Sequence, residues 1–348
     1  MTRREFLHTS AALAATTGLS RAQAEPDQPP IRIGFLGGSH SHGPGKADVL
    51  FNSDAWEIVG VVDSNPEVLA KYEKEGIKGI SQLELLEKAD VIAVESDVAD
   101  HYQHGKIVLE AGKHLHIEKP PTMTLDEFRE LLAIAKSEKL LMQMGYMWRF
   151  NPGVNAALKI AREGWLGQVY MVKAEINKLI GEGSRAELAF PGGTMFELGC
   201  HVIDPVVRLL GRPEKVTTHL KSSGGFDDQI VDNAIAVFDY SSTTAIVGSA
   251  VIHPRGHLYR HLYLYGTNGT VRVEPLDMPR MTVELKEDAG DYKRGIQTVE
   301  FDRYHRYVGE FEELASSIRS NKPLGVTPES DLIVHEALLR ACGVINGS

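Results

Sequence analysis

Short apolar runs alternate with helical patterns through the first 150 residues of the chain. The runs are Ile31–Leu36, Ile58–Val62, Asp90–Val94, Lys113–Ile117 and Leu140–Tyr146. Strands that alternate with helices of ordinary length form right-handed βαβ units on a parallel sheet. Residues 31–150 are therefore predicted to fold as an α/β domain with a parallel, Rossmann-type sheet.

The best-marked helix of this half is predicted over Thr124–Glu138. Glu127 follows Thr124 by three residues, which is the spacing of a capping box, and apolar residues then recur at helical intervals. The Pro120-Pro121 pair that precedes it cannot continue a strand ladder or sit inside a helix. The chain is therefore expected to leave the sheet sharply just before this helix.

Beyond Pro152 the pattern changes to closely spaced strands. After a helix at Val154–Glu163, alternating runs occur at Val169–Leu179, Ala234–Tyr240, Thr243–Ile252, Leu258–Tyr265, Val271–Glu274, Met281–Lys286 and Gln297–Phe301. The segment Gly266–Thr270 reads as a hairpin turn. Residues 151–348 are predicted to form an α+β domain with a large, open, mostly antiparallel sheet. Its last part, residues 304–348, should form closing helices that pack back on the first domain.

One helix is predicted inside the strand-rich half, over Met195–Leu210. Glu197, His201 and Asp204 stand at positions i, i+4 and i+7, so all three lie on one helical face. A core helix requires only an apolar face. A face with two carboxylates and an imidazole is typical of the wall of a cleft.

The first 30 residues resemble a targeting segment rather than part of the fold. Twin arginines, Arg3 and Arg4, precede the weakly apolar run Ala11–Leu19, and Ala22-Gln23-Ala24 offers a cleavage site. Residues 1–24 are thus expected to be a twin-arginine signal peptide and residues 25–30 a linker. The protein is therefore expected to be periplasmic or otherwise exported. Stable membrane insertion is not expected, because the apolar run is too short to span a bilayer.

Composition narrows the choice of partners. The 348 residues carry a net charge of −10, which makes nucleic acid a poor partner. The two cysteines, Cys200 and Cys342, give neither a disulfide framework nor a zinc spacing. A small molecule is the expected partner.

A glycine turn follows the first strand. Gly37, Gly38, Ser39, His40 and His42 lie between this strand and a helix expected from about residue 46, which is the layout of a dinucleotide-binding turn. The usual three-glycine spacing is not intact, because serine and histidine occupy the later positions. The histidines could bind phosphate oxygens or a metal. No third metal ligand is placed by sequence, so no metal site is predicted.

An acidic residue ends the second strand at the distance expected for ribose recognition. Asp63 lies roughly 20–25 residues after the glycine turn, where a carboxylate binds the ribose hydroxyls of NAD and repels a 2′-phosphate. NAD is therefore favoured over NADP. The same residue could instead cap the helix that starts near Pro66.

Charged residues also end the fourth strand, where ligands bind in open α/β sheets. Glu118 and Lys119 occupy this place, just before Pro120. For an arbitrary Glu-Lys-Pro, a solvated loop lysine would be the better explanation. The surrounding motifs favour a functional lysine.

Together these features resemble the Gfo/Idh/MocA family, named for glucose–fructose oxidoreductase and inositol dehydrogenase. The likeness covers nearly the whole chain after residue 30. Its marks are the turn at Ile33–Gly43, Asp63, His101, Ala111–His114, Glu118-Lys119-Pro120, Gly145-Tyr146, Arg149–Pro152, Gly164, Gly167, Glu197–His201 and Asp204. No single one of these motifs identifies the family, but their order and spacing together are specific for it.

The resemblance implies a role for each of these residues. Lys119 would lie between nicotinamide and substrate, His201 would act as general base, and Glu197 would take the place usually held by an aspartate. Tyr146, Arg149 and Asp204 would contact substrate. The cofactor-binding residues would be Gly37, Gly38, Ser39, His40, His42, Asp63, Ser96, His101, Glu118 and Lys119, with Ser96 standing where a threonine–proline pair is common. A homodimer or homotetramer would form through the open sheet.

Three functional readings follow. The first is an NAD(H)-dependent oxidoreductase that acts on a carbohydrate or polyol, with Lys119 and His201 as the acid–base pair. The second is an NAD-dependent glycoside hydrolase or lyase that holds its cofactor permanently and oxidises the sugar transiently. The third is a non-catalytic sugar-binding protein on the same fold.

Overall fold

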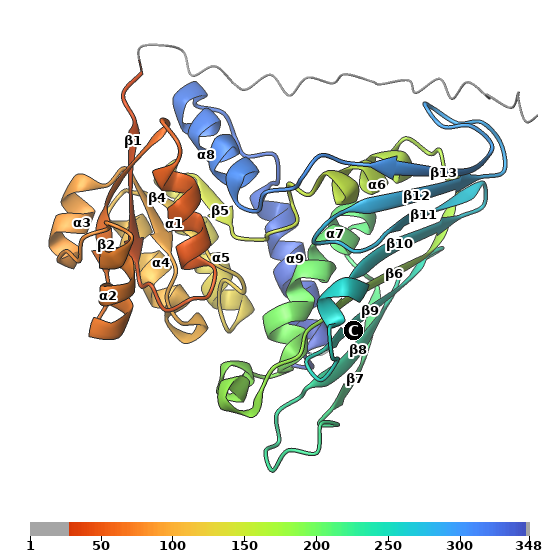
Figure 1. Ribbon diagram of the computed structural model, residues 1–348, viewed down its shortest axis with the longest axis horizontal. Coiled ribbons are helices and arrows are strands. Elements are labelled where there is room, and N and C mark those ends of the chain that lie inside the picture. Colours follow the sequence, from red (N-terminus) through yellow and green to blue (C-terminus); the bar gives the residue numbers. More distant parts are fainter. Residues whose placement is uncertain (1–27, 346–348) are drawn as a thin grey trace, which may run out of the picture.

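The computed structural model describes residues 28–345, and their strands form two sheets side by side (Figure 1). The expected signal peptide and residues 25–27 of the expected linker lie outside the described residues. The parallel sheet and the larger antiparallel sheet appear in the predicted order along the chain. The predicted fold class is therefore confirmed.

The first sheet is parallel throughout and has the strand order β2-β1-β3-β4-β5. Its strands are β1 (Ile31–Leu36), β2 (Trp56–Val62), β3 (Val91–Val94), β4 (His114–Ile117) and β5 (Met142–Met144), and its helices are α1 (Gly43–Phe51), α2 (Pro66–Lys74), α3 (Gln82–Lys88), α4 (His101–Glu110) and α5 (Leu125–Ser137). The chain passes to opposite sides of β1 to reach β2 and β3, so the switch point lies between β1 and β3. Ligands bind in open α/β sheets at the carboxyl ends of the strands beside such a point.

The second sheet has eight strands in the order β13-β12-β11-β10-β6-β9-β8-β7. The strands are β6 (Val169–Asn177), β7 (Lys215–Lys221), β8 (Asn233–Asp239), β9 (Thr244–Ala250), β10 (His261–Gly266), β11 (Gly269–Val273), β12 (Arg280–Leu285) and β13 (Gly295–Glu300). Only the β6–β9 pair is parallel. β7 has no predicted counterpart, because this edge strand consists mainly of lysine, threonine and histidine and fully buries only Val216.

Helices cover one face of the eight-stranded sheet, the face toward the first domain, and leave the other face open (Figure 1). They are α6 (Pro152–Arg162), α7 (Cys200–Leu210) and α9 (Pro328–Ala341). α8 (Val308–Ser320) packs instead against the parallel sheet, where the ring centroid of Phe311 lies 5.8 Å from that of Trp56 in β2 and 5.0 Å from that of His116 in β4. α9 packs against α7 and β7 of its own domain and also against α5 of the first domain. A hydrogen bond of 3.0 Å between His335 Nε2 and Thr122 Oγ1 lies at this junction.

The predicted helix Met195–Leu210 is not regular throughout. It begins as a π-helix over Met195–Gly199 and becomes α-helical only at Cys200. A π-turn widens the helix and shifts the phase of the residues before it, so Glu197 does not keep the angular position that α-helical spacing gives it. Pro205 lies inside α7 and has no backbone N–H, which leaves the carbonyl of His201 without its helical partner.

Short 3₁₀ segments complete the described chain, at Val98–Asp100, Glu182–Leu188 and Gly256–Tyr259. The last of these replaces the start of the predicted strand Leu258–Tyr265. The strand therefore begins only at His261.

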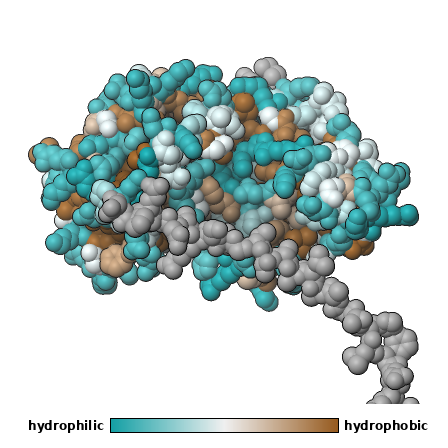
Figure 2. All heavy atoms as spheres, turned by 90° about the horizontal axis from the view of Figure 1, so that it is seen from above, coloured by the Kyte–Doolittle hydropathy of each residue, from teal (hydrophilic) through white to brown (hydrophobic). Residues whose placement is uncertain are grey.

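No helix of the described part of the chain is long and apolar enough to cross a membrane. Hydrophilic side chains cover most of the face seen from above, and hydrophobic ones are scattered between them (Figure 2).

The capping box at the start of α5 is confirmed, and it generates a stability prediction. Thr124 Oγ1 accepts from the Glu127 N–H at 3.3 Å, and Glu127 Oε2 accepts from the Thr124 N–H at 3.0 Å. Thr124→Ala should lower the free energy of unfolding by about 1 kcal/mol, because one helix-end N–H loses its acceptor. Urea titration measures the change. Thr124→Ser retains the oxygen, and an equal loss in that variant would refute the capping explanation.

Candidate active site

Four residues follow directly after the parallel strands and meet at one edge of the sheet. Gly37 follows β1, Asp63 follows β2, Glu95 follows β3 and Glu118 follows β4. Gly37 has φ +78°, and a side chain here would place its Cβ 2.4 Å from Ser96 Cβ. A glycine is required at this point because the turn passes so close to the end of β3.

Asp63 is held in place by backbone donors. Its carboxylate accepts from the N–H of Gly38 and from the N–H of Asn65, both at 2.8 Å. Asn65, not Asp63, caps α2, since its side chain accepts from the Glu67 N–H at 2.9 Å. The capping alternative for Asp63 is thereby excluded, and its carboxylate lies beside the glycine turn.

A fully buried lysine of α1 ties the ends of β3 and β4 together beneath this turn. Lys46 of α1 places Nζ 2.7 Å from Glu95 Oε1 and 2.7 Å from His116 Nε2, and it also donates to Glu118 Oε1. Burial by itself raises the pKa of Glu118, but Lys46 and the neighbouring histidines outweigh it and hold that pKa well below its usual range. Burial raises the pKa of Glu95 despite the same lysine. Glu118 is therefore the ionised member of the two carboxyls.

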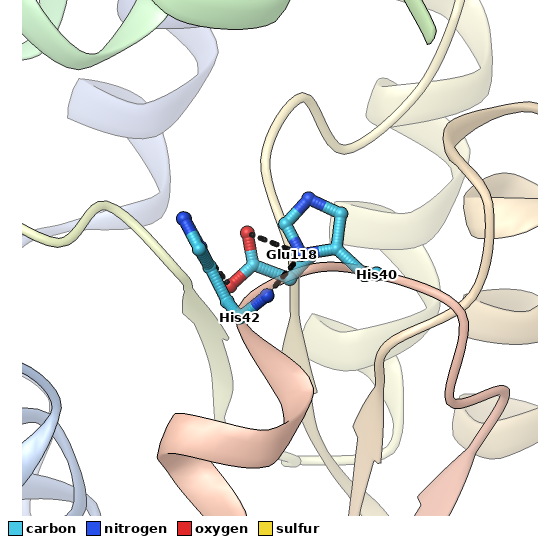
Figure 3. A group of neighbouring side chains, drawn as sticks. All are labelled: His40, His42 and Glu118. Carbon is cyan, nitrogen blue, oxygen red and sulfur yellow. Dashed lines mark hydrogen bonds and ion pairs between the residues drawn. The ribbon is translucent and has the colours of Figure 1, made fainter. Parts of the chain in front are cut away.

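Both histidines of the turn face Glu118 (Figure 3). His42 Nδ1 lies 3.0 Å from Glu118 Oε1, and His40 Nδ1 lies 3.7 Å from Glu118 Oε2. Burial lowers the pKa of both imidazoles, although Glu118 opposes the shift. The rings are therefore neutral, and their nitrogens and the carboxylate form a group with the geometry to hold a metal ion.

Lys119 reaches in the opposite direction, toward the second domain. Its Nζ donates to Glu197 Oε1 at 2.7 Å and to the Glu197 carbonyl at 3.1 Å. Burial lowers the pKa of Lys119, but Glu197 outweighs it and the net shift is upward. Glu197, expected as the partner of His201, thus forms a direct ion pair with Lys119 across the two domains.

His201 lies one turn further along the same helix in an aromatic enclosure. Its ring centroid is 5.9 Å from that of Trp148, 5.9 Å from that of His42 and 6.3 Å from that of Tyr146. Its Nδ1 is buried without a hydrogen-bond partner. Burial, followed by Lys119 and His42, lowers the pKa of His201 well below its ordinary value. The imidazole is neutral and has the capacity to accept a proton.

Arg149 connects two acidic side chains from distant parts of the chain. It donates to Asp204 at 2.7 and 3.0 Å and also to Asp331 of α9, and its guanidinium lies 4.6 Å from the centre of the Tyr146 ring. Asp204, predicted to contact substrate, is therefore already engaged by Arg149. Tyr146 is buried, and its ring centroid lies 6.3 Å from that of His201.

The remaining predicted residues lie around the end of β3. His101 Nδ1 is 2.7 Å from the Pro120 carbonyl, and its Nε2 is 3.0 Å from the Ser96 carbonyl, so the ring bridges the loops after β3 and β4. Ser39 Oγ donates to Asp97 Oδ1 at 2.7 Å. The Ser96 hydroxyl is buried without a partner.

Several residues at the site were not predicted from the sequence. They are Lys46, Glu95, His116, Trp148, Glu310 and Asp331. The sequence could have indicated two of them. His116 is two positions before Glu118, so the two share one face of the strand, and Lys46 follows His42 by one helical turn. Asp331 joins the site only through the packing of α9, for which the local sequence has no marker.

Two family models match this chain in sequence order. The first, described as the oxidoreductase family, NAD-binding Rossmann fold (GFO_IDH_MocA), matches residues 31–146, and the second, the GFO/IDH/MocA C-terminal domain, matches residues 154–272. The chain belongs to the Gfo/Idh/MocA family of oxidoreductases. The family expectation from the sequence is thus confirmed, and with it the NAD(P)-binding character of the first domain.

Relatives and solved structures agree with this assignment. Scyllo-inositol 2-dehydrogenase (NADP(+)) of Bacillus subtilis is 25% identical over 87% of this chain and 90% of its own length. D-glucoside 3-dehydrogenase of Escherichia coli is 27% identical over 66% of this chain and 69% of its own. A putative NADPH-dependent oxidoreductase of Desulfitobacterium hafniense has the same fold, with a TM-score of 0.79 over 92% of this chain and 96% of the other, at 18% identity.

The buried carboxyl of Glu310 in α8 generates a pH prediction. Burial raises its pKa to about 7 from an ordinary 4.5, and both of its oxygens lack partners. The folded state binds the Glu310 proton more tightly than the unfolded state does. The stability that this gives is therefore fully present below pH 4.5 and is lost as the pH rises to 7. Between these values the unfolding free energy should fall by roughly 1–3 kcal/mol more in the parent protein than in Glu310→Gln.

Denaturant titrations across this pH range measure the difference, with Glu312→Gln on the exposed side of α8 as the control. Parallel curves for the parent protein and Glu310→Gln would contradict the prediction.

Proposed function

We propose that this protein is an NAD(H)-dependent oxidoreductase that acts on a hydroxyl group of a carbohydrate or polyol. Membership of the family supports the oxidoreductase class. The observation that carries the finer proposal is the ion pair of Lys119 with Glu197 beside the unpartnered imidazole of His201. This arrangement joins the end of the parallel sheet to the helix that faces it from the second domain.

The chain's residues fit a nicotinamide dinucleotide. Asp63 and the glycine turn lie at the carboxyl ends of β2 and β1, where the ribose and pyrophosphate of a dinucleotide bind. Three buried polar atoms lack partners near the expected nicotinamide position: Ser96 Oγ, Glu197 Oε2 and His201 Nδ1. Buried polar atoms without partners are rare in native proteins, and a bound cofactor with its substrate would satisfy them.

The proposed chemistry divides between cofactor and protein. The nicotinamide supplies the hydride acceptor or donor when bound. The neutral ring of His201 accepts the hydroxyl proton at Nδ1, while the ammonium of Lys119 stabilises the negative charge that develops on the substrate oxygen. Glu197 holds Lys119 in position, and the aromatic rings around His201 keep water from it.

The Lys119 side chain gives the direct test of this proposal. Lys119→Ala should lower kcat by roughly 10²–10⁴-fold, the usual contribution of a positioned acid–base group, while NADH still binds. Turnover with a panel of sugars and polyols and NADH fluorescence titration measure the two quantities. Lys88→Ala removes an exposed lysine of α3 and should change neither. Unchanged turnover in Lys119→Ala would sink the proposal.

Asp63 supports NAD rather than NADP in this proposal, because its fixed carboxylate would repel a 2′-phosphate. The named relatives include NADP(+)- and NADPH-linked proteins, so the preference requires measurement. Asp63→Ser should weaken NADH binding and strengthen NADPH binding, which lowers the affinity ratio at least tenfold. An unchanged ratio of NADH to NADPH affinity would mean that Asp63 only stabilises the turn and does not select the cofactor.

A second candidate function is cleavage of a glycosidic bond with a permanently held cofactor. The twin-arginine segment favours it, because that route carries folded proteins and free NAD is scarce outside the cytoplasm. Acid denaturation of the purified protein should then release near-stoichiometric NAD(H), and glycosides should be cleaved without net formation of NADH. Cofactor that is absent after purification but binds when added favours the simple dehydrogenase.

A further inference from the structure

The histidines of the glycine turn generate an inference independent of the oxidoreductase proposal. Two groups of three potential ligands share Glu118: His40, His42 and Glu118 form one, and Glu95, His116 and Glu118 the other. The second group already holds a cation, because the Lys46 ammonium lies 2.7 Å from both Glu95 Oε1 and His116 Nε2. In the first group the Lys46 ammonium contacts Glu118, at Oε1, and the described residues show no such contact for His40 or His42.

We propose that His40, His42 and Glu118 bind a divalent transition-metal ion of the zinc type. Two imidazole nitrogens and one carboxylate form a ligand set that such ions prefer, and three protein ligands leave a position open for an oxygen ligand. The three side chains converge on one point between the turn and the end of β4 (Figure 3).

The distances match this occupant. Ligands about 2.0–2.1 Å from a tetrahedral zinc ion lie about 3.4 Å from one another. His42 Nδ1 is 3.0 Å from one oxygen of Glu118, and His40 Nδ1 is 3.7 Å from the other. One ligand atom from each of the three side chains lies within 4.8 Å of the other two.

The contact between His40 and Glu118 lacks a donor. His40 Nδ1 accepts from the His42 N–H at 3.3 Å, so this nitrogen carries no hydrogen to donate, and the ionised Glu118 Oε2 lies 3.7 Å from it. Two acceptors turned toward each other repel, and a cation between them removes the repulsion. A second oxygen nearby is also unpartnered, since Glu95 Oε2 lies 3.9 Å from the same nitrogen and bonds to nothing.

His201 lies on the open side of the proposed site. Its ring centroid is 5.9 Å from that of His42, and its buried Nδ1 has no partner. An ion bound here would therefore face the same space in which the proposed substrate hydroxyl reacts. Its open position would take a water, hydroxyl or phosphate oxygen.

Zinc binding to the purified full chain tests the proposal, after removal of metals with a chelator. Competition with a chromophoric zinc chelator should show one equivalent of Zn²⁺, and Co²⁺ should give the visible absorption of a tetrahedral site. His40→Gln and His42→Gln should each weaken Zn²⁺ binding at least tenfold, as expected for loss of a ligand. Circular dichroism and thermal unfolding confirm that the variants fold.

His219→Gln and His257→Gln are matched controls, because both histidines are exposed and lie in the second domain. They should bind Zn²⁺ like the parent protein. Absence of saturable Zn²⁺ binding, or equal binding in His40→Gln, His42→Gln and these controls, would overturn the proposal. NADH titration of the same proteins reports separately on the dehydrogenase proposal, so the two can fail independently.

Discussion

The buried ammonium of Lys46 is the constraint on which the candidate site depends. It contacts groups that follow or belong to β3 and β4, and it comes from the helix directly behind the glycine turn. An isolated charge in such a position would be prohibitively costly, and the carboxylates alone would repel one another. The lysine therefore fixes the spacing of three elements at once. Glycine is needed at residue 145 for the same reason, because a Cβ there would lie 2.8 Å from Glu118 Oε1 and 3.0 Å from Lys46 Nζ.

This arrangement gives the two ends of the Glu118–Lys119 dipeptide opposite roles. Glu118 points back into the first domain, toward the histidines of the turn, while Lys119 points forward to Glu197. Adjacent residues at the end of a strand turn to opposite sides, so one dipeptide serves both faces of the candidate site. The π-turn at Met195–Gly199 brings Glu197 within reach of that lysine, and such turns are frequent at functional sites.

The sequence was sufficient for the architecture, for α5 with its cap, and for most residues at the strand ends. Periodicity reports burial on one face of an element, and the carboxyl ends of parallel strands must share an edge. Tertiary pairings are different in kind. Asp331 meets Arg149 because α9 packs across the molecule, and β7 is a strand because it completes an edge, not because its residues favour that state. Asp204, assigned to the substrate by its place on a polar face, pairs with Arg149 for the same tertiary reason. Local patterns cannot encode such partners, which lie 55 positions apart for Arg149 and Asp204 and 182 positions apart for Arg149 and Asp331.

The position of α9 has a consequence for motion. This helix contacts α5 of the first domain and α7 of the second. Its Asp331 accepts a hydrogen bond from Arg149, and its His335 is hydrogen-bonded to Thr122 in the loop after Lys119. Hinge closure between the domains would have to break all of these links together. Lys119 on one side and Glu197 and His201 on the other are thus held at a constant separation, and such preorganisation is a large part of what a catalytic site contributes to rate.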